Sequence, residues 1–385
     1  MLLTLLFLVS VVVLVWTYFG YPALMALRAR FQSIPIQKDE QYRPSVTLLI
    51  PAYNEADVIR RKLENSVKLV YPADKLEILV IDDGSSDGTA EIVREYVPRG
   101  VKLHQQPVRQ GKMAGVNAGF ERASGEIVIL SDASPDYEPH AIEKLVRSFA
   151  DPSVGVVVGK LAVWDAQNAV AKPAGFYWKY EAALRKWETQ TGSTVAVHGN
   201  MFAIRRALHR PLRNATINDE FTLAIDVMRQ GYRVVYEPEA ISYDDASASM
   251  GDEFKRRARI NAGRYQGVAS ASYLTVPNAD VVFRFVSHKL MRSFAPIFML
   301  LALITNVLQV LLDGGWSWWL LLAAQIVFYG LAAVGWKLEQ AGKRSRIASI
   351  PYFFVSTNLA ALVGLWRWIT RTQKVTWQKR SAEKA

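Results

Sequence analysis

The chain has no cysteine among its 385 residues. That absence excludes disulfide bridges, thiolate metal sites and a cysteine nucleophile, and it fits a reducing compartment. Charge is missing from four long stretches, residues 1–27, 294–312, 316–336 and 347–366. Each is about as long as the roughly 20 apolar residues that cross a bilayer. A signal peptide is the alternative for the first stretch, but a basic leading region and a clear cleavage site are both missing. We therefore expect an integral membrane protein.

Positive charge exceeds negative charge, with 46 Lys and Arg against 35 Asp and Glu, for a net charge of +11. Nucleic-acid binding would be one reason, but no helix-turn-helix or aromatic RNA-binding pattern accompanies the charge. The basic residues gather beside the apolar stretches, at Arg28 and Arg30, in residues 337–346 and in residues 367–380. Such flanks mark the cytoplasmic side of a span and attract anionic lipid. The sequence thus predicts a multi-pass protein of the cell (inner) membrane, a cytoplasmic central domain, and membrane lipids but no nucleic acid as partners.

The side of the membrane on which the chain ends stays open at this point. Three spans after a cytoplasmic domain would leave the basic tail, residues 369–385, outside, whereas its charge favours the inside. Pro351 and the polar Ser356-Thr357-Asn358 predict that the last apolar stretch is broken or re-entrant.

The hydrophilic part, residues 44–250, alternates strand-like and helix-like patterns, which predicts an α/β layered domain. Strands are expected at 46–50, 76–81, 101–104, 127–130, 154–160 and 234–237, and helices at 55–68, 88–96, 112–123, 139–149 and 221–230. Residues 251–292 are amphipathic and basic, as is typical of helices that lie on a membrane surface. Residues 293–368 would hold the remaining transmembrane helices.

Two of the expected strands end in acidic residues. Residues 76–81 are followed by Asp82 and Asp83, and residues 127–130 by Ser131 and Asp132. Ligands of an open α/β sheet bind at the carboxyl ends of its strands, so both acidic groups should face one crevice. Carboxylates there suit a hard divalent cation, which usually bridges to substrate phosphates.

Each motif also has a plainer interpretation. Asp82-Asp83-Gly84-Ser85 can be a turn with a helix N-cap, and Asp219-Glu220 a capping pair. Asp132-Ala133-Ser134 can begin an ordinary turn. Arg109-Gln110-Gly111-Lys112 can be a basic loop, although a Gly before a Lys at a helix start also cradles phosphate. The basic stretch from Arg256 to Arg259 would usually be a solvated or lipid-facing surface.

The order of the motifs is more specific than any one of them. In chain order they are Pro51-Ala52-Tyr53-Asn54-Glu55, the acidic stretch from Asp82 to Thr89, Gly111-Lys112 with Asn117, Ser131-Asp132-Ala133, residues 175–181, His198-Gly199-Asn200, Asp219-Glu220-Phe221 and residues 231–238. This order resembles family 2 glycosyltransferases, with the membrane-embedded branch of cellulose, hyaluronan, chitin and poly-N-acetylglucosamine synthases the most similar. The resemblance implies a GT-A-like nucleotide-sugar-binding domain of α/β class, followed by interfacial helices and transmembrane α-helices.

The resemblance also implies how the donor, a UDP-sugar, is bound. Tyr53, Glu55 and Asp83 would line the uridine site, and Asp82 would support their loop. Lys112 would meet the diphosphate.

The other implied roles concern the metal and the reaction. Asp132 would bind Mg²⁺ or Mn²⁺ together with the nucleotide, and Ser134 stands where a second metal-binding acid often falls. Glu220 would be the base that deprotonates the acceptor hydroxyl, with Asp219 as the fallback.

One motif departs from the branch. Processive synthases usually carry Gln-x-x-Arg-Trp on an interfacial helix, and here Arg256, Arg259 and Ile260 stand at the Gln, Arg and Trp positions. Arg259 is expected to reach the donor diphosphate, and Arg256 is expected to take part in binding the nucleotide sugar. The missing Trp, which would pack at the acceptor, leaves chain elongation open.

Together these patterns predict a membrane-bound inverting glycosyltransferase that adds a sugar from a UDP-sugar to a growing extracellular polysaccharide. Transfer of a single sugar to a lipid carrier, such as polyprenyl phosphate or a glycolipid, is the alternative within the same class. A non-catalytic membrane scaffold with a decayed fold is the alternative of another class, and the retained acidic residues and Lys112 argue against it. The spans are few for a complete export channel, so a homo-oligomer or a partner subunit is expected to complete one.

Overall fold

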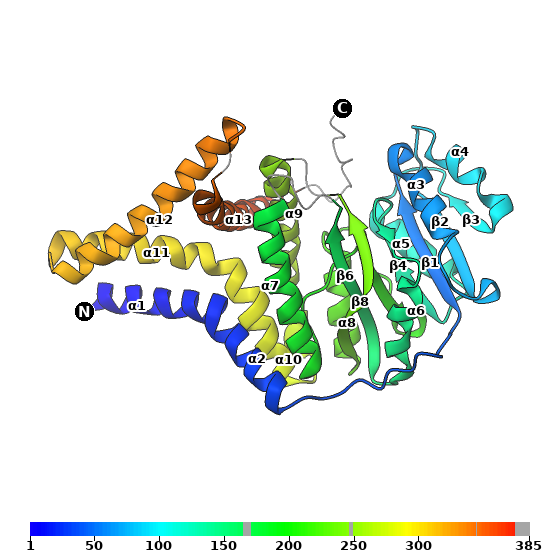
Figure 1. Cartoon of the computed structure of the whole chain (residues 1–385), viewed down its shortest axis with the longest axis horizontal. Helices are drawn as coiled ribbons and strands as arrows, with labels where there is room; N and C mark the ends of the chain where they lie inside the picture. Colours follow the sequence, from blue (N-terminus) through cyan, green and yellow to red (C-terminus); the bar gives the residue numbers. More distant parts are fainter. Residues whose placement is uncertain (165–170, 246–248, 344, 374–385) are drawn as a thin grey trace.

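The computed structural model of the chain describes residues 1–164, 171–245, 249–343 and 345–373 (Figure 1). An α/β domain lies at one end of the molecule and a group of long helices at the other, with α7 (Ala171–Gln190) and α9 (Met250–Ala269) between them. The N-terminus lies at the far end of the long helices.

One mixed sheet forms the centre of the α/β domain, with strand order β3-β2-β1-β4-β7-β6-β8-β5. The strands are β1 (Val46–Ala52), β2 (Leu76–Asp82), β3 (Val101–Gln105), β4 (Ile127–Leu130), β5 (Asp136–Tyr137), β6 (Val154–Val163), β7 (Phe202–Arg205) and β8 (Arg233–Asp244). β1 pairs in parallel with β2 and β4, and β2 with β3, so these strands end at the same edge. All residues of β1 are buried, as expected of a strand covered on both faces. The α/β class is confirmed.

The helices of this domain also agree with the sequence pattern. They are α3 (Ala56–Ser66), α4 (Thr89–Arg94), α5 (Lys112–Arg122), α6 (Ala141–Val146) and α8 (Asp219–Arg229). The described part of this domain also contains elements that the pattern does not predict: the short strand β5, antiparallel to β8, the short antiparallel strand β7 between β4 and β6, and the helix α7 (Ala171–Gln190). The pattern of α7 was hard to recognise because its buried positions include the charged Glu181, Arg185 and Glu188.

Among the residues that the structure describes, four helices are long and apolar enough to cross a membrane. They are Leu2–Phe31, Ala279–Leu312, Trp316–Gln340 and Arg346–Ile369. The first joins α1 (Leu2–Val15) to α2 (Tyr21–Phe31), and the second joins α10 (Ala279–Arg284) to α11 (Met291–Leu312), each through one π-helical turn. The last two are α12 (Trp316–Gln340) and α13 (Arg346–Ile369), so the four apolar stretches of the sequence all form helices.

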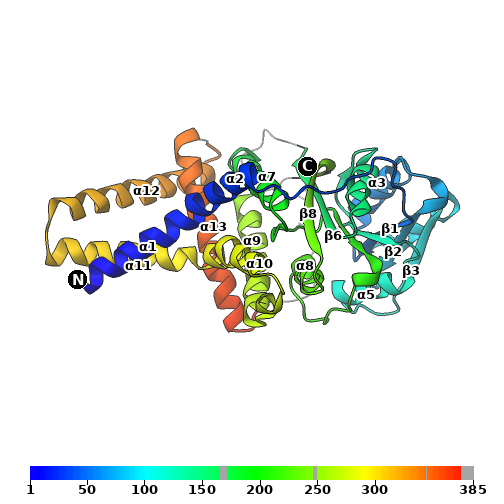
Figure 2. The same cartoon turned by 90° about the horizontal axis from the view of Figure 1, so that it is seen from below.

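The last helix, α13, differs from the expectation and from its neighbours. It is continuous, so the prediction of a broken last segment is wrong. Pro351 lies inside the helix without ending it, and Ser356 and Asn358 are buried in helix packing. The Tyr18 hydroxyl donates to Asn358 Oδ1 at 3.1 Å. α1, α11 and α12 extend along the length of the molecule, whereas α13 runs across it (Figures 1 and 2).

Helix α9 (Met250–Ala269) connects α13 to the α/β domain. A Cβ on Gly364 of α13 would come within 2.7 Å of the Ala258 carbonyl oxygen of α9. A Cβ on Gly267 of α9 would come within 2.8 Å of the Phe221 ring of α8. The chain between residues 251 and 292 is mainly helical, as expected, and α9 is held between α8 and α13.

Candidate active site

The parallel strands β2 and β4 bring their acidic residues to one edge of the sheet. Asp82 is fully buried and accepts the Ser85 backbone N–H at 3.3 Å. Asp83 accepts the backbone N–H groups of Gln110 at 2.7 Å and Gly111 at 2.8 Å. Gly111 has φ +97°, which suits glycine, and it caps the N-terminus of α5. Asp83 therefore fixes the loop that delivers Lys112, the first residue of α5.

A second part of this edge carries Tyr53 and Arg109. The Arg109 guanidinium lies 3.8 Å from the centre of the Tyr53 ring, which is a cation–π contact. Glu55 immediately precedes α3, and its backbone N–H donates to Thr89 Oγ1 at 2.9 Å. The loops that carry Tyr53 and Glu55 and those that carry Asp82 and Asp83 are thus held side by side. The sequence does not single out Arg109 as a member of this group, because its stretch fits a basic loop as well as a phosphate-binding helix start.

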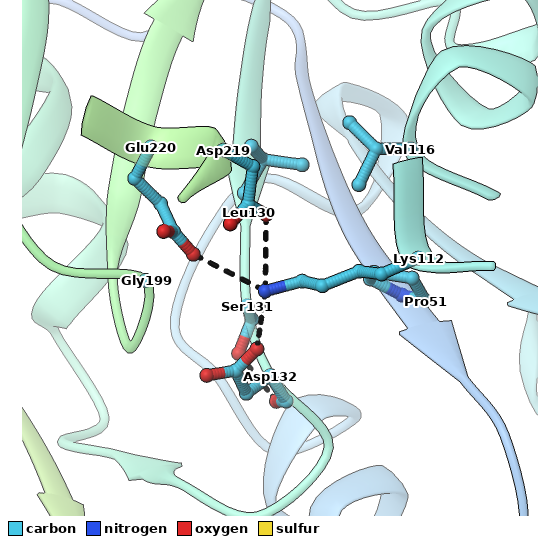
Figure 3. Close-up of a pocket in the computed structure, with 9 residues that line it drawn as sticks. All are labelled: Pro51, Lys112, Val116, Leu130, Ser131, Asp132, Gly199, Asp219 and Glu220. Carbon is cyan, nitrogen blue, oxygen red and sulfur yellow. Dashed lines mark hydrogen bonds and ion pairs between the residues drawn. The ribbon is translucent and has the colours of Figure 1, made fainter. Parts of the chain in front are cut away.

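The Lys112 ammonium lies at the centre of a small pocket, between three carboxylates (Figure 3). Its Nζ is 3.0 Å from Asp132 Oδ1, 3.0 Å from Asp219 Oδ2 and 3.2 Å from Glu220 Oε1. Residues from α5, from the end of β4 and from the start of α8 therefore meet at one point. Asp132, Asp219 and Glu220, named from different parts of the sequence, belong to one site.

The start of α8 shows that Asp219-Glu220 is not merely a capping pair. Asn218 is the capping residue, and its side chain accepts the Phe221 backbone N–H at 3.4 Å. Asp219 and Glu220 are free to point into the pocket. Gly199 lies against Glu220, because a Cβ there would come within 1.9 Å of Glu220 Oε1. The glycine of His198-Gly199-Asn200 is thus needed for the close approach of this carboxylate.

The pocket shifts the pKa values of its members in opposite directions. Burial, and then the neighbouring Asp219 carboxylate, raises the pKa of Glu220 to about 8. Burial would also raise the pKa of Asp219, but the Lys112 ammonium and the hydrogen bonds that Asp219 makes together outweigh it and lower that pKa. Burial disfavours the Lys112 ammonium, yet the carboxylates around it raise its pKa well above the usual range. Glu220 is therefore the carboxylate that exchanges a proton near neutral pH.

Asp132 and Ser134, the residues expected to bind a metal, follow the end of β4. The Asp132 side chain is 33% exposed and faces the pocket. The Ser134 carbonyl accepts from Arg61 at 2.8 Å, and Arg61 also pairs with Asp136 and Asp245. Within the described ranges, no three His, Cys, Asp or Glu residues are grouped so that they could hold a metal ion. The donor set fits a divalent cation only as one carboxylate, Asp132, so phosphate oxygens of a ligand would have to supply the remaining coordination.

Arg256 and Arg259 do not line the pocket around Lys112. Both lie on α9, where Arg256 forms an ion pair with Glu253 at 2.8 Å and Arg259 is exposed. In this structure neither arginine lines the pocket of Asp132, Asp219 and Glu220.

A family model described as glycosyl transferase family 2 matches residues 47–213, which include the strand-edge motifs and Lys112. This chain carries a family 2 glycosyltransferase domain. The chain is 31% identical over 257 residues to a protein named a probable glycosyltransferase, YdaM, of Bacillus subtilis (strain 168), over 62% of this chain and 60% of that protein. It is 26% identical over 230 residues to the poly-beta-1,6-N-acetyl-D-glucosamine synthase of Staphylococcus aureus (strain MSSA476), over 57% of this chain and 55% of that protein. The chain thus spans less than two thirds of the length of either relative.

A solved structure is similar over nearly the whole chain. The mannosyltransferase PcManGT from Pyrobaculum calidifontis, in complex with GDP-Man and Mn2+, has a TM-score of 0.71 and 26% identity, over 94% of this chain and 99% of that chain. This similarity confirms the GT-A-like fold and includes the long helices as well as the α/β domain.

Proposed function

We propose that this glycosyltransferase transfers a sugar, with inversion, from a UDP-sugar to a growing extracellular polysaccharide, at the cytoplasmic face of the membrane. The observation that carries the proposal is the pocket in which Lys112 meets Asp132, Asp219 and Glu220. A cation beside a potential base is the combination that sugar transfer from a nucleotide diphosphate requires. The similarity to a poly-beta-1,6-N-acetyl-D-glucosamine synthase supports a polysaccharide as the product.

The proposed reaction is a single displacement. Glu220 takes the proton of the acceptor hydroxyl, and the hydroxyl oxygen forms a bond to the anomeric carbon of the sugar. The bond between that carbon and the diphosphate oxygen breaks on the opposite side, and the electron pair leaves with UDP. Lys112 turns from Glu220 to the diphosphate and neutralises the charge that develops there.

Glu220 is preferred over Asp219 as the base for a physical reason. Its pKa of about 8 lies close to neutral pH, so it can both gain and lose a proton there. The pKa of Asp219 is lowered, which makes it a weaker base and a partner for Lys112.

A divalent cation, Mg²⁺ or Mn²⁺, would be held by Asp132 and the donor phosphates, with Ser134 contributing through water at most. When bound, it would add charge stabilisation to the leaving diphosphate. The Mn2+ in the mannosyltransferase structure supports this assignment.

The nucleotide is proposed to lie over the loop of Tyr53, Asp82 and Asp83, with Glu55 at its edge. Arg109, stacked on the Tyr53 ring, extends the same surface. Because the similar mannosyltransferase holds GDP-Man, a GDP-sugar is the second donor class to be tested.

The proposed orientation uses three spans. α1–α2, α10–α11 and α12 cross the membrane, and α13 lies flat beside α9 at the cytoplasmic surface. Support comes from the direction of α13 across the other long helices (Figure 2) and from the basic residues that follow it in the sequence. In this arrangement the basic tail is on the inside, which removes the conflict between span number and charge.

The test is UDP release by the purified full chain in lipid nanodiscs, with a panel of UDP- and GDP-sugars, Mg²⁺ or Mn²⁺, and product sizing. We expect turnover with one UDP-sugar and a long product. A one-sugar lipid product would replace the polysaccharide by a lipid carrier. Failure to bind any nucleotide sugar would contradict the proposed function.

A further inference from the structure

Four cationic side chains gather around one carboxylate where the α/β domain meets the long helices. They are Arg185 of α7, Arg264 of α9, Lys289 of the π-helical turn before α11, and Arg292 of α11, and the carboxylate is Glu181 of α7. Arg185, Arg264 and Arg292 all lie within electrostatic range of Lys289. We call these four residues the cation cluster.

Arg185 is the least satisfied member of the cluster. Only 5% of it is exposed, and its Nε is buried without a hydrogen-bond partner. Its guanidinium has no hydrogen bond or ion pair to any described residue, and its Cζ lies 5.8 Å from the ring centres of Trp178 and Tyr236. A buried guanidinium without an acceptor is costly, which indicates that an anion completes its surroundings.

The other three cations of the cluster have few acidic partners, and two of them share Glu181. Arg292 forms an ion pair with Glu181, and its Nε is also buried without a partner. Lys289 Nζ is 3.9 Å from Glu181, at the limit of an ion pair. Arg264 has one hydrogen bond, 3.3 Å long, to Asn261 on its own helix. Glu188, the next carboxylate of α7, is taken by Tyr21, His288 and Thr194.

The position of the cluster relates it to the reaction and to the membrane. Burial, and then the charge of Arg185, lowers the pKa of His198 to about 3, so Arg185 and His198 lie within electrostatic range of each other. His198 precedes Gly199, which lies against Glu220. On the other side, Lys289 and Arg292 belong to the candidate span Ala279–Leu312. The cluster therefore lies between the pocket of Glu220 and the helices that enter the membrane.

We propose that the cation cluster binds the phosphate group of a membrane lipid to which the sugar acceptor is attached. An arginine guanidinium can bind two phosphate oxygens at once, so phosphate would supply acceptors for Arg185, which has none, and for Arg264, whose one hydrogen bond is to Asn261 of its own helix. A lipid is favoured over a soluble phosphate because half of the cluster lies on a candidate span. The Tyr180 hydroxyl also donates to the Tyr18 carbonyl of the first span, at 3.2 Å, beside Arg292. The proposal rests on the proposed function only in taking the growing polysaccharide as the acceptor that this lipid anchors.

The test measures lipid binding by the full chain in phosphatidylcholine nanodiscs with and without phosphatidic acid, which carries a phosphate monoester. Native mass spectrometry of the released complex would count bound phosphatidic acid. Arg185→Gln and Arg264→Gln, alone and together, remove cations without leaving a carboxylate unpaired. Lys255→Gln is the matched control, because Lys255 is an exposed cation on α9 outside the cluster.

We expect the double variant to bind phosphatidic acid about tenfold or more weakly than the wild type, and Lys255→Gln to bind as the wild type does. Equal binding by the double variant and the wild type would overturn the proposal. Displacement of the lipid by inorganic phosphate at similar concentration would overturn the lipid as its source.

The proposed function is tested separately in the same nanodiscs. UDP binding is measured, together with the slow release of UDP from a UDP-sugar in the absence of acceptor. Loss of lipid binding with UDP binding intact supports the cluster as a phosphate site. Absence of nucleotide binding in the wild type would count against the proposed function and not against the cluster.

Discussion

At the scale of single residues, the positive charge of Lys112 allows three carboxylates to lie close together in the pocket. Three carboxylates within reach of one another would repel, and the ammonium lets them lie together while burial keeps Glu220 available for a proton. Asp83 contributes indirectly, because its hydrogen bonds to Gln110 and Gly111 position the start of α5. Two predictions follow from these contacts.

Glu220→Gln should reduce sugar transfer by about 10²- to 10⁴-fold, because the amide cannot accept the proton of the acceptor hydroxyl. Nucleotide binding should be retained, since Asp132 and Lys112 remain. UDP release and UDP titration by calorimetry measure the two properties on the same protein. Full transfer activity in this variant would remove Glu220 from the role of base.

The raised pKa of Glu220 predicts a pH profile. The base must be unprotonated, so kcat/KM should rise with pH up to about 8 and then level off. Asp219→Asn removes a neighbouring negative charge that helps to raise this pKa, and the rise should move to lower pH. A profile that is flat between about pH 6 and 9 would contradict the assignment.

At the scale of elements, the parallel strands were the most predictable part. Continuous apolar runs ending in Asp identified β2 and β4, since a strand buried on both faces needs apolar side chains on both. β7 was missed because its four residues, Phe202–Arg205, depend on pairing with β4 and β6. α7 was missed because its buried charges acquire partners only from other helices, as Glu181 does from Arg292.

The packing of α13 on α9 gives a prediction at this scale. A Cβ on Gly364 would lie 2.7 Å from the Ala258 carbonyl oxygen, whereas a Cβ on Gly330 of α12 would meet nothing within 4 Å. Gly364→Ala should therefore destabilise the protein by ~1–3 kcal/mol through overpacking. Gly330→Ala should be neutral or slightly stabilising, because alanine favours helix.

The stabilities of Gly364→Ala, Gly330→Ala and the wild type can be compared by thermal unfolding in the same detergent. An equal effect of the two substitutions would mean that α13 does not pack on α9 as described.

The whole molecule decides the membrane topology. The chain has no native cysteine, so each introduced cysteine is a unique label. Thr372→Cys after α13, Ala341→Cys after α12 and Ser317→Cys at the start of α12 all replace exposed residues. With three spans, a membrane-impermeant maleimide should label positions 372 and 341 only in inverted vesicles, and position 317 only in intact cells.

Position 372 distinguishes the alternatives. If α13 crossed the membrane as a fourth span, Thr372→Cys would be labelled with Ser317→Cys in intact cells. That result would overturn the flat orientation of α13 while leaving the other three helices as spans.

The sequence by itself determined the α/β class, the four long apolar helices and the acidic residues at the strand ends, because these depend on local patterns of burial and on strand direction. Which of these residues meet in one pocket was decided by the tertiary structure. Only the approach of α8 to α5 and β4 places Glu220 and Asp219 at Lys112, and only Gly199 leaves room for it. The course of α13 and the cation cluster were likewise invisible in the sequence, since helix direction and charge pairing arise between segments far apart in the chain.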